Sequence, residues 1–186
     1  PTAPFVEGDR VRDHAVNGTS TVAFPYAPGA DDESIASALW PWRTQLVNAS
    51  SGRSGNDGAW WRYYQFTPER FEADVVITYA EVASSNHFAV TDGGKVMKQT
   101  APVVTFAQGT TRDRVAAVAA TLNTSVASFW LKQNCHDKGI RGEGGGFTSD
   151  EWERFYQFNS TNVRQLPVPS RLPVARGSEI EKLVRD

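Results

Sequence analysis

The sequence predicts an α+β fold in a single domain, in which a twisted, mostly antiparallel sheet with hairpins is flanked by helices. The length of 186 residues suits one compact domain and is too short for two large ones. Runs that alternate apolar and polar residues, as half-buried strands do, occur at the start and in the middle of the chain. After Thr111 the spacing of apolar residues becomes helical.

The first part of the chain predicts two short strands and a kinked helix. The stretches FVEGDRVRDH and STVAFPY alternate in polarity, which favours half-buried strands. Apolar residues from Ile35 to Leu46 then recur at helical spacing, behind acidic residues that favour the positive end of a helix dipole. Pro41 lies inside this pattern, so we expect it to kink or end the helix.

The middle of the chain predicts most of the sheet. A polar loop over residues 48–59 leads into the aromatic run WWRYYQF, which we interpret as a strand or an extended segment. DVVITYAEV and APVVTF are strand-like, and HFAVTDGGKVMKQ contains two strand-like runs around Asp92-Gly93-Gly94. Because glycine adopts positive φ readily, this turn predicts that the two runs pair as a hairpin.

A long helical segment follows Thr110 and Thr111, which are both suitable N-caps. We expect this helix, with a break near Asn123, to reach about Cys135. Its apolar residues are predicted to share one face and are Val115, Val118, Leu122, Val126 and Phe129.

Two further helices are predicted near the end of the chain. TSDEWERF and SEIEKLVRD each place Glu three residues after Thr148 or Ser178, the spacing of a capping box. Residues 1–170 are assigned to the domain. Residues 171–186 are assigned to the start of a following helical segment, as expected for a piece of a longer protein.

Cys135, His136 and Asp137 are three potentially catalytic residues in a row. A nucleophile and its base must lie within hydrogen-bonding distance, whereas neighbouring side chains in a strand or helix diverge. We therefore interpret Cys135 as a partly buried structural thiol beside a histidine at the end of a helix, where a cation is favoured by the dipole.

No catalytic, cofactor or metal motif is present in the sequence. Three histidines and one cysteine provide no recognisable set of metal ligands. The glycines from Gly142 to Gly146 do not follow a strand and lack a phosphate-binding motif, so a surface loop is expected. The lone cysteine excludes a disulfide within the chain and suits a cytoplasmic protein. No apolar run approaches the roughly 20 residues of a membrane-spanning helix, so a membrane partner is not expected.

Hydrogen-bond donors near the predicted loops and turns suggest contacts to DNA. Arg and Lys can recognise guanine in the major groove, and Asn and Gln can recognise adenine. The formal net charge of −2 counts against nucleic acid as the sole partner. The candidate DNA-binding residues are Arg43, Arg62, Asn86, His87, Lys95, Lys98, Gln99, Lys138 and Arg141.

Three stretches resemble the C-terminal part of BREX phage-defence adenine-specific DNA methyltransferases of the PglX type. They are ITYAEVASSNHFAVTDGGKVMKQTAPVV, LNTSVASFWLKQNCHDKG and WERFYQF…NVRQLPVP, and the likeness spans roughly residues 5–170. The pattern LN-S…F…L…G, followed by Pro-x-Pro, is also similar to recognition domains of type I restriction specificity subunits. The second stretch looks like a structural helix followed by a loop.

The resemblance implies a non-catalytic target recognition domain that binds double-stranded DNA and sets its sequence specificity. An N-terminal methylase domain of the same parent chain would then hold S-adenosylmethionine and methylate adenine N6. No cofactor is expected in this fragment. Other BREX subunits are further partners implied by the resemblance, and the bacterial cytoplasm is the implied location.

Two other functions are compatible with the sequence. The chain could be a protein-interaction module that docks the methylase domain or another defence subunit through the aromatic residues Trp60, Trp61, Tyr63 and Tyr64. It could also be a small hydrolase that uses Cys135, which would require a reactive thiol of low pKa.

Overall fold

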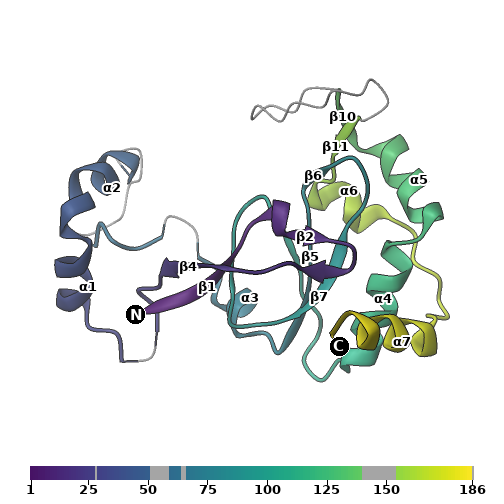
Figure 1. Ribbon diagram of the computed structural model, residues 1–186, viewed down its shortest axis with the longest axis horizontal. Helices are drawn as coiled ribbons and strands as arrows, with labels where there is room; N and C mark the ends of the chain where they lie inside the picture. The colour runs from purple at the N-terminus through teal and green to yellow at the C-terminus, as the bar shows by residue number, and fades with distance from the viewer. Residues whose placement is uncertain (28, 51–58, 64–65, 140–153, 186) are drawn as a thin grey trace.

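Small β-sheets form the middle of the molecule, and helices lie towards both ends of its long axis (Figure 1). The computed structural model describes residues 1–27, 29–50, 59–63, 66–139 and 154–185. The helices are α1 (Asp32–Leu39), α2 (Arg43–Ser50), α3 (Pro68–Glu72), α4 (Arg112–Leu122), α5 (Ser125–Asn134), α6 (Ser160–Gln165) and α7 (Val174–Arg185), with 3₁₀ turns η1 (Gly8–Arg10) and η2 (Trp40–Trp42).

The strands form several small sheets rather than one. They are β1 (Thr2–Val6), β2 (Val11–Arg12), β3 (Ala15–Val16), β4 (Ser20–Ala23), β5 (Val75–Tyr79), β6 (Val82–Ala83), β7 (Phe88–Asp92), β8 (Val96–Met97), β9 (Val103–Val104), β10 (His136–Gly139) and β11 (Phe155–Gln157). The sheet orders are β4-β1-β8, β10-β11-β6, β2-β3 and β7-β5-β9. Only the β1–β8 pair is parallel in the described chain. The predicted α+β class with mostly antiparallel pairing is confirmed.

Strand β5 lies at the centre of the main hydrophobic core. It pairs with β7 on one side and β9 on the other, and α4 packs against it. Ile77 and Tyr79 from β5 are buried together with Val115 from α4, Leu131 from α5 and Phe158. A strand buried on both faces is nearly continuously apolar, which explains why this run was recognisable in the sequence.

The predicted hairpin around Asp92-Gly93-Gly94 is wrong, because the two strands belong to different sheets. Strand β7 pairs with β5, whereas β8 pairs with β1. The amide of Gly93 donates to the carbonyl of Asp74, and that of Gly94 donates to Phe71 at 2.7 Å. Gly94 adopts a φ of +72°. These bonds hold the turn against the start of β5. The chain therefore leaves the β7-β5-β9 sheet and crosses to the β4-β1-β8 sheet.

A hairpin does occur between β2 and β3, at a position without glycine. Its two turn residues, Asp13 and His14, have φ values of 51° and 67°. Positive φ at both central positions is the geometry of a type I′ turn. Asp and His tolerate this region better than most residues. The sequence signal is weak because the turn lacks the usual Asn-Gly or Asp-Gly pair.

The predicted break between two helices near Asn123 is confirmed, but the predicted common face is wrong. Thr124 begins α5 as its N-cap and accepts a hydrogen bond from the amide of Ala127 at 3.2 Å. The break changes the direction of the chain, so Ala127 and Leu131 point into the core. Val126 and Phe129 are 79% and 68% exposed.

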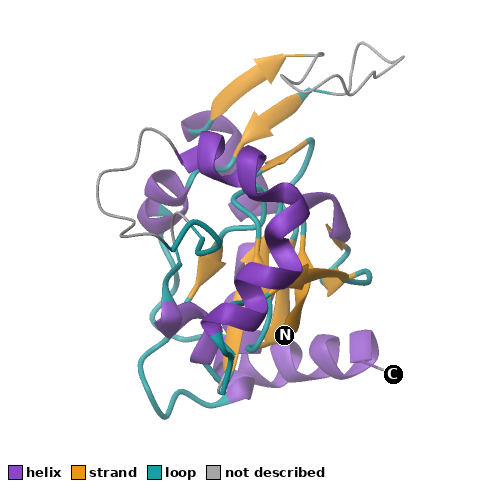
Figure 2. Cartoon of the chain, turned by 90° about the vertical axis from the view of Figure 1, so that its left-hand side faces the viewer, coloured by secondary structure: helices purple, strands orange, loops and turns teal. Residues whose placement is uncertain are grey.

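Helix α7 packs along α4 at the lower edge of the molecule, whereas the β10–β11 pair lies at the upper edge (Figures 1 and 2). It begins at Val174, four residues before the predicted start at Ser178. The hydroxyl of Ser178 lies inside the helix and donates to Val174 and to Asp113, so the predicted cap is wrong. The amide of Gly177 donates to the carbonyl of Pro173, which extends the helix towards that proline.

Three other local predictions differ from the structure, and one lies outside the described residues. Residues 60–62 form a turn rather than a strand. Phe155, predicted to be helical, lies in β11. His136, expected at the end of a helix, begins β10. The predicted cap at Thr148 lies outside the described residues. Pro41 does interrupt its helix, since η2 separates α1 from α2.

Candidate nucleic-acid interface

A groove with a volume of about 670 Å³ lies beside the Asp92-Gly93-Gly94 turn. We call it the basic groove. The apolar part of its lining includes the rings of Tyr63, Phe66 and Phe71, together with Met97 and Val103. Its polar and charged lining side chains are Thr67, Arg70, Glu81, Lys95, Lys98, Gln99, Asn159 and Ser160.

Three separate elements bring these polar side chains together. The segment around β8 supplies Lys95, directly before the strand, and Lys98 and Gln99, directly after it. The turn directs this segment away from the sheet of β7. Helix α3 supplies Arg70, which is exposed. The start of α6 supplies Asn159, the N-cap, whose side chain accepts from the amide of Asn162 at 2.9 Å.

The lining of the basic groove contains three cationic side chains and one acidic side chain. Lys95 donates to the carbonyl of Asp92 at 2.8 Å. Lys98 pairs with Glu7 at 2.7 Å, and this hydrogen bond holds the pKa of the ammonium above its usual value. Glu81 accepts from Gln157 at 3.0 Å. The local balance is therefore positive, although the chain as a whole is slightly acidic.

Asn86 and His87, both predicted to contact DNA, have partners within the fold and do not line the basic groove. The side chain of Asn86 is only 9% exposed and donates to the carbonyl of Leu122 at the end of α4. Nδ1 of His87 accepts from the amide of Asp13 at 3.4 Å. Burial lowers the pKa of His87, which favours the neutral ring. These positions favour structural roles for both side chains.

The other predicted DNA-binding residues are dispersed. Arg43 lies over the ring of Trp40, 5.2 Å from its centroid, and Arg62 pairs with Asp32 at 3.4 Å. Lys138 lies in β10, and Arg141 lies outside the described residues. The structure therefore brings together three of the nine candidates, which all come from residues 95–99. Arg70 was missed by sequence reasoning, because nothing local indicates that α3 faces β8.

The tryptophans of the aromatic run are less exposed than a docking surface centred on them would require. Trp60 and Trp61 are partly buried, and Tyr63 donates to the carbonyl of Ala23. The more exposed indoles belong to η2, where Trp40 and Trp42 are 62% and 53% exposed. Most of the predicted aromatic surface thus contributes to packing.

Cys135 is a core residue. Its side chain is 8% exposed, and burial raises the pKa of the thiol. Asn162 approaches the sulfur at 3.8 Å. Asp137, two residues further along, pairs with Arg154 at 2.7 Å. The thiol thus has the opposite of the low pKa that a nucleophilic cysteine needs.

We expect Cys135 to resist alkylation. Because the thiol is buried and its pKa is raised, iodoacetamide at pH 8 should label the folded chain at least about tenfold more slowly than the urea-unfolded chain. Mass spectrometry of the intact chain over time measures both rates. Equal rates would mean that the thiol is accessible, and faster labelling of the folded chain would restore the hydrolase hypothesis.

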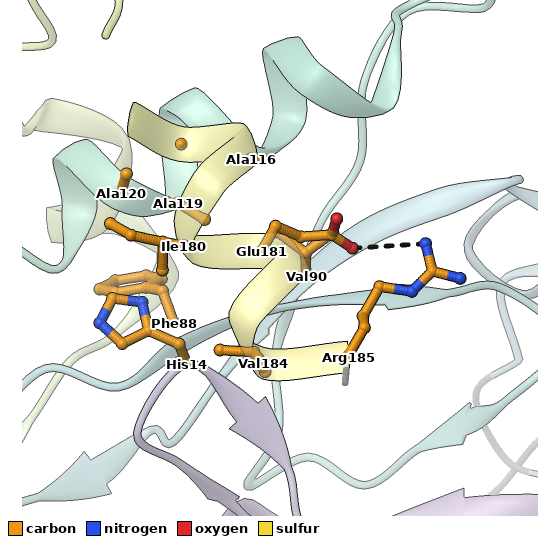
Figure 3. Close-up of a pocket in the computed structure, with 11 residues that line it drawn as sticks. His14, Phe88, Val90, Ala116, Ala119, Ala120, Ile180, Glu181, Val184 and Arg185 are labelled. Carbon is orange, nitrogen blue, oxygen red and sulfur yellow. Dashed lines mark ion pairs between the residues drawn. The ribbon is translucent and has the colours of Figure 1, made fainter. Parts of the chain in front are cut away.

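A small cavity beneath α7 belongs to the packing of the fold. Its volume is about 30 Å³, and Phe88, Ile180 and His14 are among the side chains around it (Figure 3). A space of this size holds about one water molecule. Glu181 and Arg185 of α7 form an ion pair at its edge at 3.7 Å (Figure 3).

The described part of the chain contains no group of three or more side chains able to hold a metal ion. Among the same residues, no helix combines the length and the apolar composition needed to cross a membrane.

No protein-family model matches the chain. Over 194 aligned residues the chain is 28% identical to the adenine-specific methyltransferase PglX of Streptomyces coelicolor. The match covers 97% of this chain and 16% of that protein, so the chain spans about a sixth of the length of the curated relative. This similarity suggests a methyltransferase-related region and fits a fragment of a PglX-like protein.

Proposed function

We propose that this chain is the target recognition domain of a PglX-like adenine-specific DNA methyltransferase, and that it binds duplex DNA along the basic groove. The single observation that supports this most is the convergence of Lys95, Lys98 and Gln99 with Arg70 around one concave surface. Methylation of adenine N6 would take place in a methylase domain elsewhere in the longer protein, which would hold S-adenosylmethionine.

The side chains of the groove suit two kinds of DNA contact. Lysine and arginine neutralise phosphates, which fixes the position of a protein on the duplex. Gln99 is exposed and can form the paired hydrogen bonds by which an amide recognises adenine. The groove thus combines cations that position DNA with an amide that can select a base.

The ion pair between Lys98 and Glu7 does not prevent this role. Both side chains are partly exposed, at 48% and 33%. An exposed pair of this kind contributes little to stability, so Lys98 can exchange the carboxylate for a phosphate at small cost. With three cations in the groove and a net charge of −2 overall, we expect weak and strongly salt-dependent binding by the chain alone.

Substitutions in the groove test the proposal. Lys95→Ala should weaken binding to all duplexes alike and reduce the slope of log K against log salt by about 1, because one phosphate contact is lost. Gln99→Ala should instead cost about 1–3 kcal/mol on the preferred sequence and little on random DNA. Fluorescence anisotropy with labelled duplexes at several low salt concentrations measures both effects.

Lys182→Ala is the matched control, because it removes one lysine from the exposed face of α7, outside the lining of the groove. Absence of duplex binding at low salt would contradict the proposal. So would an equal loss of affinity in the Lys95 and Lys182 variants, since the groove would then have no special role. In cells, the pattern of methylated adenines should change when residues 95–99 are replaced in the longer protein.

A further inference from the structure

A second groove, separate from the basic groove, has a volume of about 450 Å³ and lies between α5 and residues 166–173. We call it the apolar groove. Its lining includes Val126, Ala127 and Trp130 from α5, and Leu166, Pro167 and Pro169 from the segment after α6. It shares no lining residue with the basic groove.

We propose that the apolar groove is the docking site for a segment of the methylase-containing remainder of the longer protein, and that this segment presents apolar side chains and a carboxylate. The inference rests on the proposed function only in that it takes the chain to be part of such a protein. It concerns a different surface and a different partner from those of DNA recognition.

The two threonine hydroxyls around the apolar groove are already used within the fold. The hydroxyl of Thr121 donates to the carbonyl of Ala117 at 2.9 Å. The hydroxyl of Thr124 donates to Thr121 at 2.8 Å and accepts from the amide of Ala127. The prolines in the lining have no amide hydrogen to offer. Apart from Arg171, a nucleic acid would find few hydrogen-bonding partners in this groove. Apolar side chains need no such partners.

Large apolar side chains remain in water on α5 and on the segment after α6, close in sequence to the residues that line the apolar groove. Phe129 is 68% exposed and Val126 is 79% exposed, and Val168 and Val174 are each 44% exposed. They lie on, or directly next to, the elements that line the groove. Single exposed apolar residues are ordinary, but a concave group of them is typical of an interaction surface.

Arg171 determines which kind of segment fits best. It is the only charged side chain among the described residues that line the apolar groove, and it is exposed. A partner that covers the groove must leave this guanidinium in water or pair it with a carboxylate. Two copies of this chain related by symmetry would oppose one Arg171 to the other, with no acid in either lining. The charge therefore favours a different, acidic segment over a second copy.

Tethering makes a shallow groove sufficient for this role. Most of the Streptomyces protein lies outside the segment that matches this chain. A domain joined to its neighbour by the same backbone docks at an effective concentration in the millimolar range, so modest affinity is enough to hold it in place. The two grooves would then have separate tasks, one towards DNA and one towards the rest of the enzyme.

Hydrogen exchange tests the inference in the full-length protein that contains this chain. Amides of residues 125–133 should exchange at least about tenfold more slowly there than in the 186-residue chain alone. Phe129→Glu should return this exchange to the rate of the chain alone. The matched control is Leu183→Glu, because Leu183 is also a largely exposed apolar helical residue, at 74%, but lies on α7. Leu183→Glu should leave the slow exchange of residues 125–133 in the full-length protein unchanged.

Equal exchange of residues 125–133 in the two proteins would overturn the inference, as would equal effects of the two glutamate variants. A dimer of the chain alone that Phe129→Glu dissolves, seen by sedimentation velocity, would assign the groove to a second copy instead. A loss of duplex affinity in Phe129→Glu would assign it to DNA. The proposed function fails separately, if the protein does not bind duplex DNA at low salt while the exchange result is as expected.

Discussion

Replacing Gly177 with alanine should lower the free energy of unfolding by about 2 kcal/mol, although the same change inside a helix usually raises it. In isolation, alanine is favoured over glycine in a helix by roughly 0.5–1 kcal/mol. At this position a β-carbon would lie 2.5 Å from the backbone of Ala117 in α4. Backbone atoms cannot turn aside as a flexible side chain can, so α7 must move away from α4.

The consequence extends beyond the two helices. Glu181 of α7 pairs with Arg112 of α4 at 2.7 Å, and Arg112 in turn pairs with Asp92 at the end of β7. Displacement of α7 would disturb this connection to the sheet. Urea denaturation followed by circular dichroism should show an earlier midpoint, and the melting temperature should fall by roughly 4–8 °C for a chain of this size.

Lys182→Ala is the control for helix propensity, because this side chain is exposed on the same helix. It should change the stability by less than about 0.5 kcal/mol. An increase in stability for Gly177→Ala would mean that α7 does not pack against α4 in solution. Residues 171–186 would then be a separate segment, as the sequence predicts. A cooperative loss of stability in Gly177→Ala would instead place them in the same folding unit as the rest of the chain.

The elements that were predicted correctly have strong local signals. Strand β5 is a short, nearly continuous apolar run, and the break between α4 and α5 coincides with Asn123 and the N-cap Thr124. The elements that were missed depend on distant partners. The turn at Gly93 and Gly94 has a hairpin sequence, but its amides bond to the segment before β5, which no local pattern can reveal.

The residues of the candidate site also differ in how far the sequence could predict that they lie together. Lys95, Lys98 and Gln99 are close in sequence and were found together, and they remain together in the structure. Arg70 joins them only through the fold. Asn86 was predicted to contact DNA because a polar residue before a strand is usually solvated, whereas in the fold its amide donates to the carbonyl of Leu122 in the last turn of α4.

Asn123 makes a reciprocal contact with the same region. Its Oδ1 accepts from the amide of Phe88 at 2.9 Å, and its Nδ2 donates to the carbonyl of Phe88 at 2.7 Å. The side chain thus replaces a neighbouring strand for one residue of β7. Nδ2 also lies 2.9 Å from Nδ1 of His14. One amide therefore joins the end of α4, the sheet and the β2–β3 turn.

We expect Asn123→Ala to cost about 3 kcal/mol of stability. Both backbone groups of Phe88 would lose their partner, and an unsatisfied buried polar group costs about 1–3 kcal/mol. Phe88 is fully buried, so any movement of β7 would also disturb the core. Urea denaturation measures the loss. Asn134→Ala is the control, since this amide is exposed and donates only to Trp130 within its own helix.

Asn123→Asp separates the two hydrogen bonds. The carboxylate keeps the acceptor for the amide of Phe88 but loses the donor, and it places a negative charge beside the carbonyl of Phe88. The folded state then favours the protonated carboxyl, whose pKa should lie above the ordinary value of about 3.9. Part of the lost stability, measured against the unsubstituted chain at each pH, should therefore return as the pH falls through that raised pKa. A deficit that does not shrink towards low pH would show that a restored donor does not recover stability, which would contradict a stabilising role for the hydrogen bond from Nδ2 to the carbonyl of Phe88.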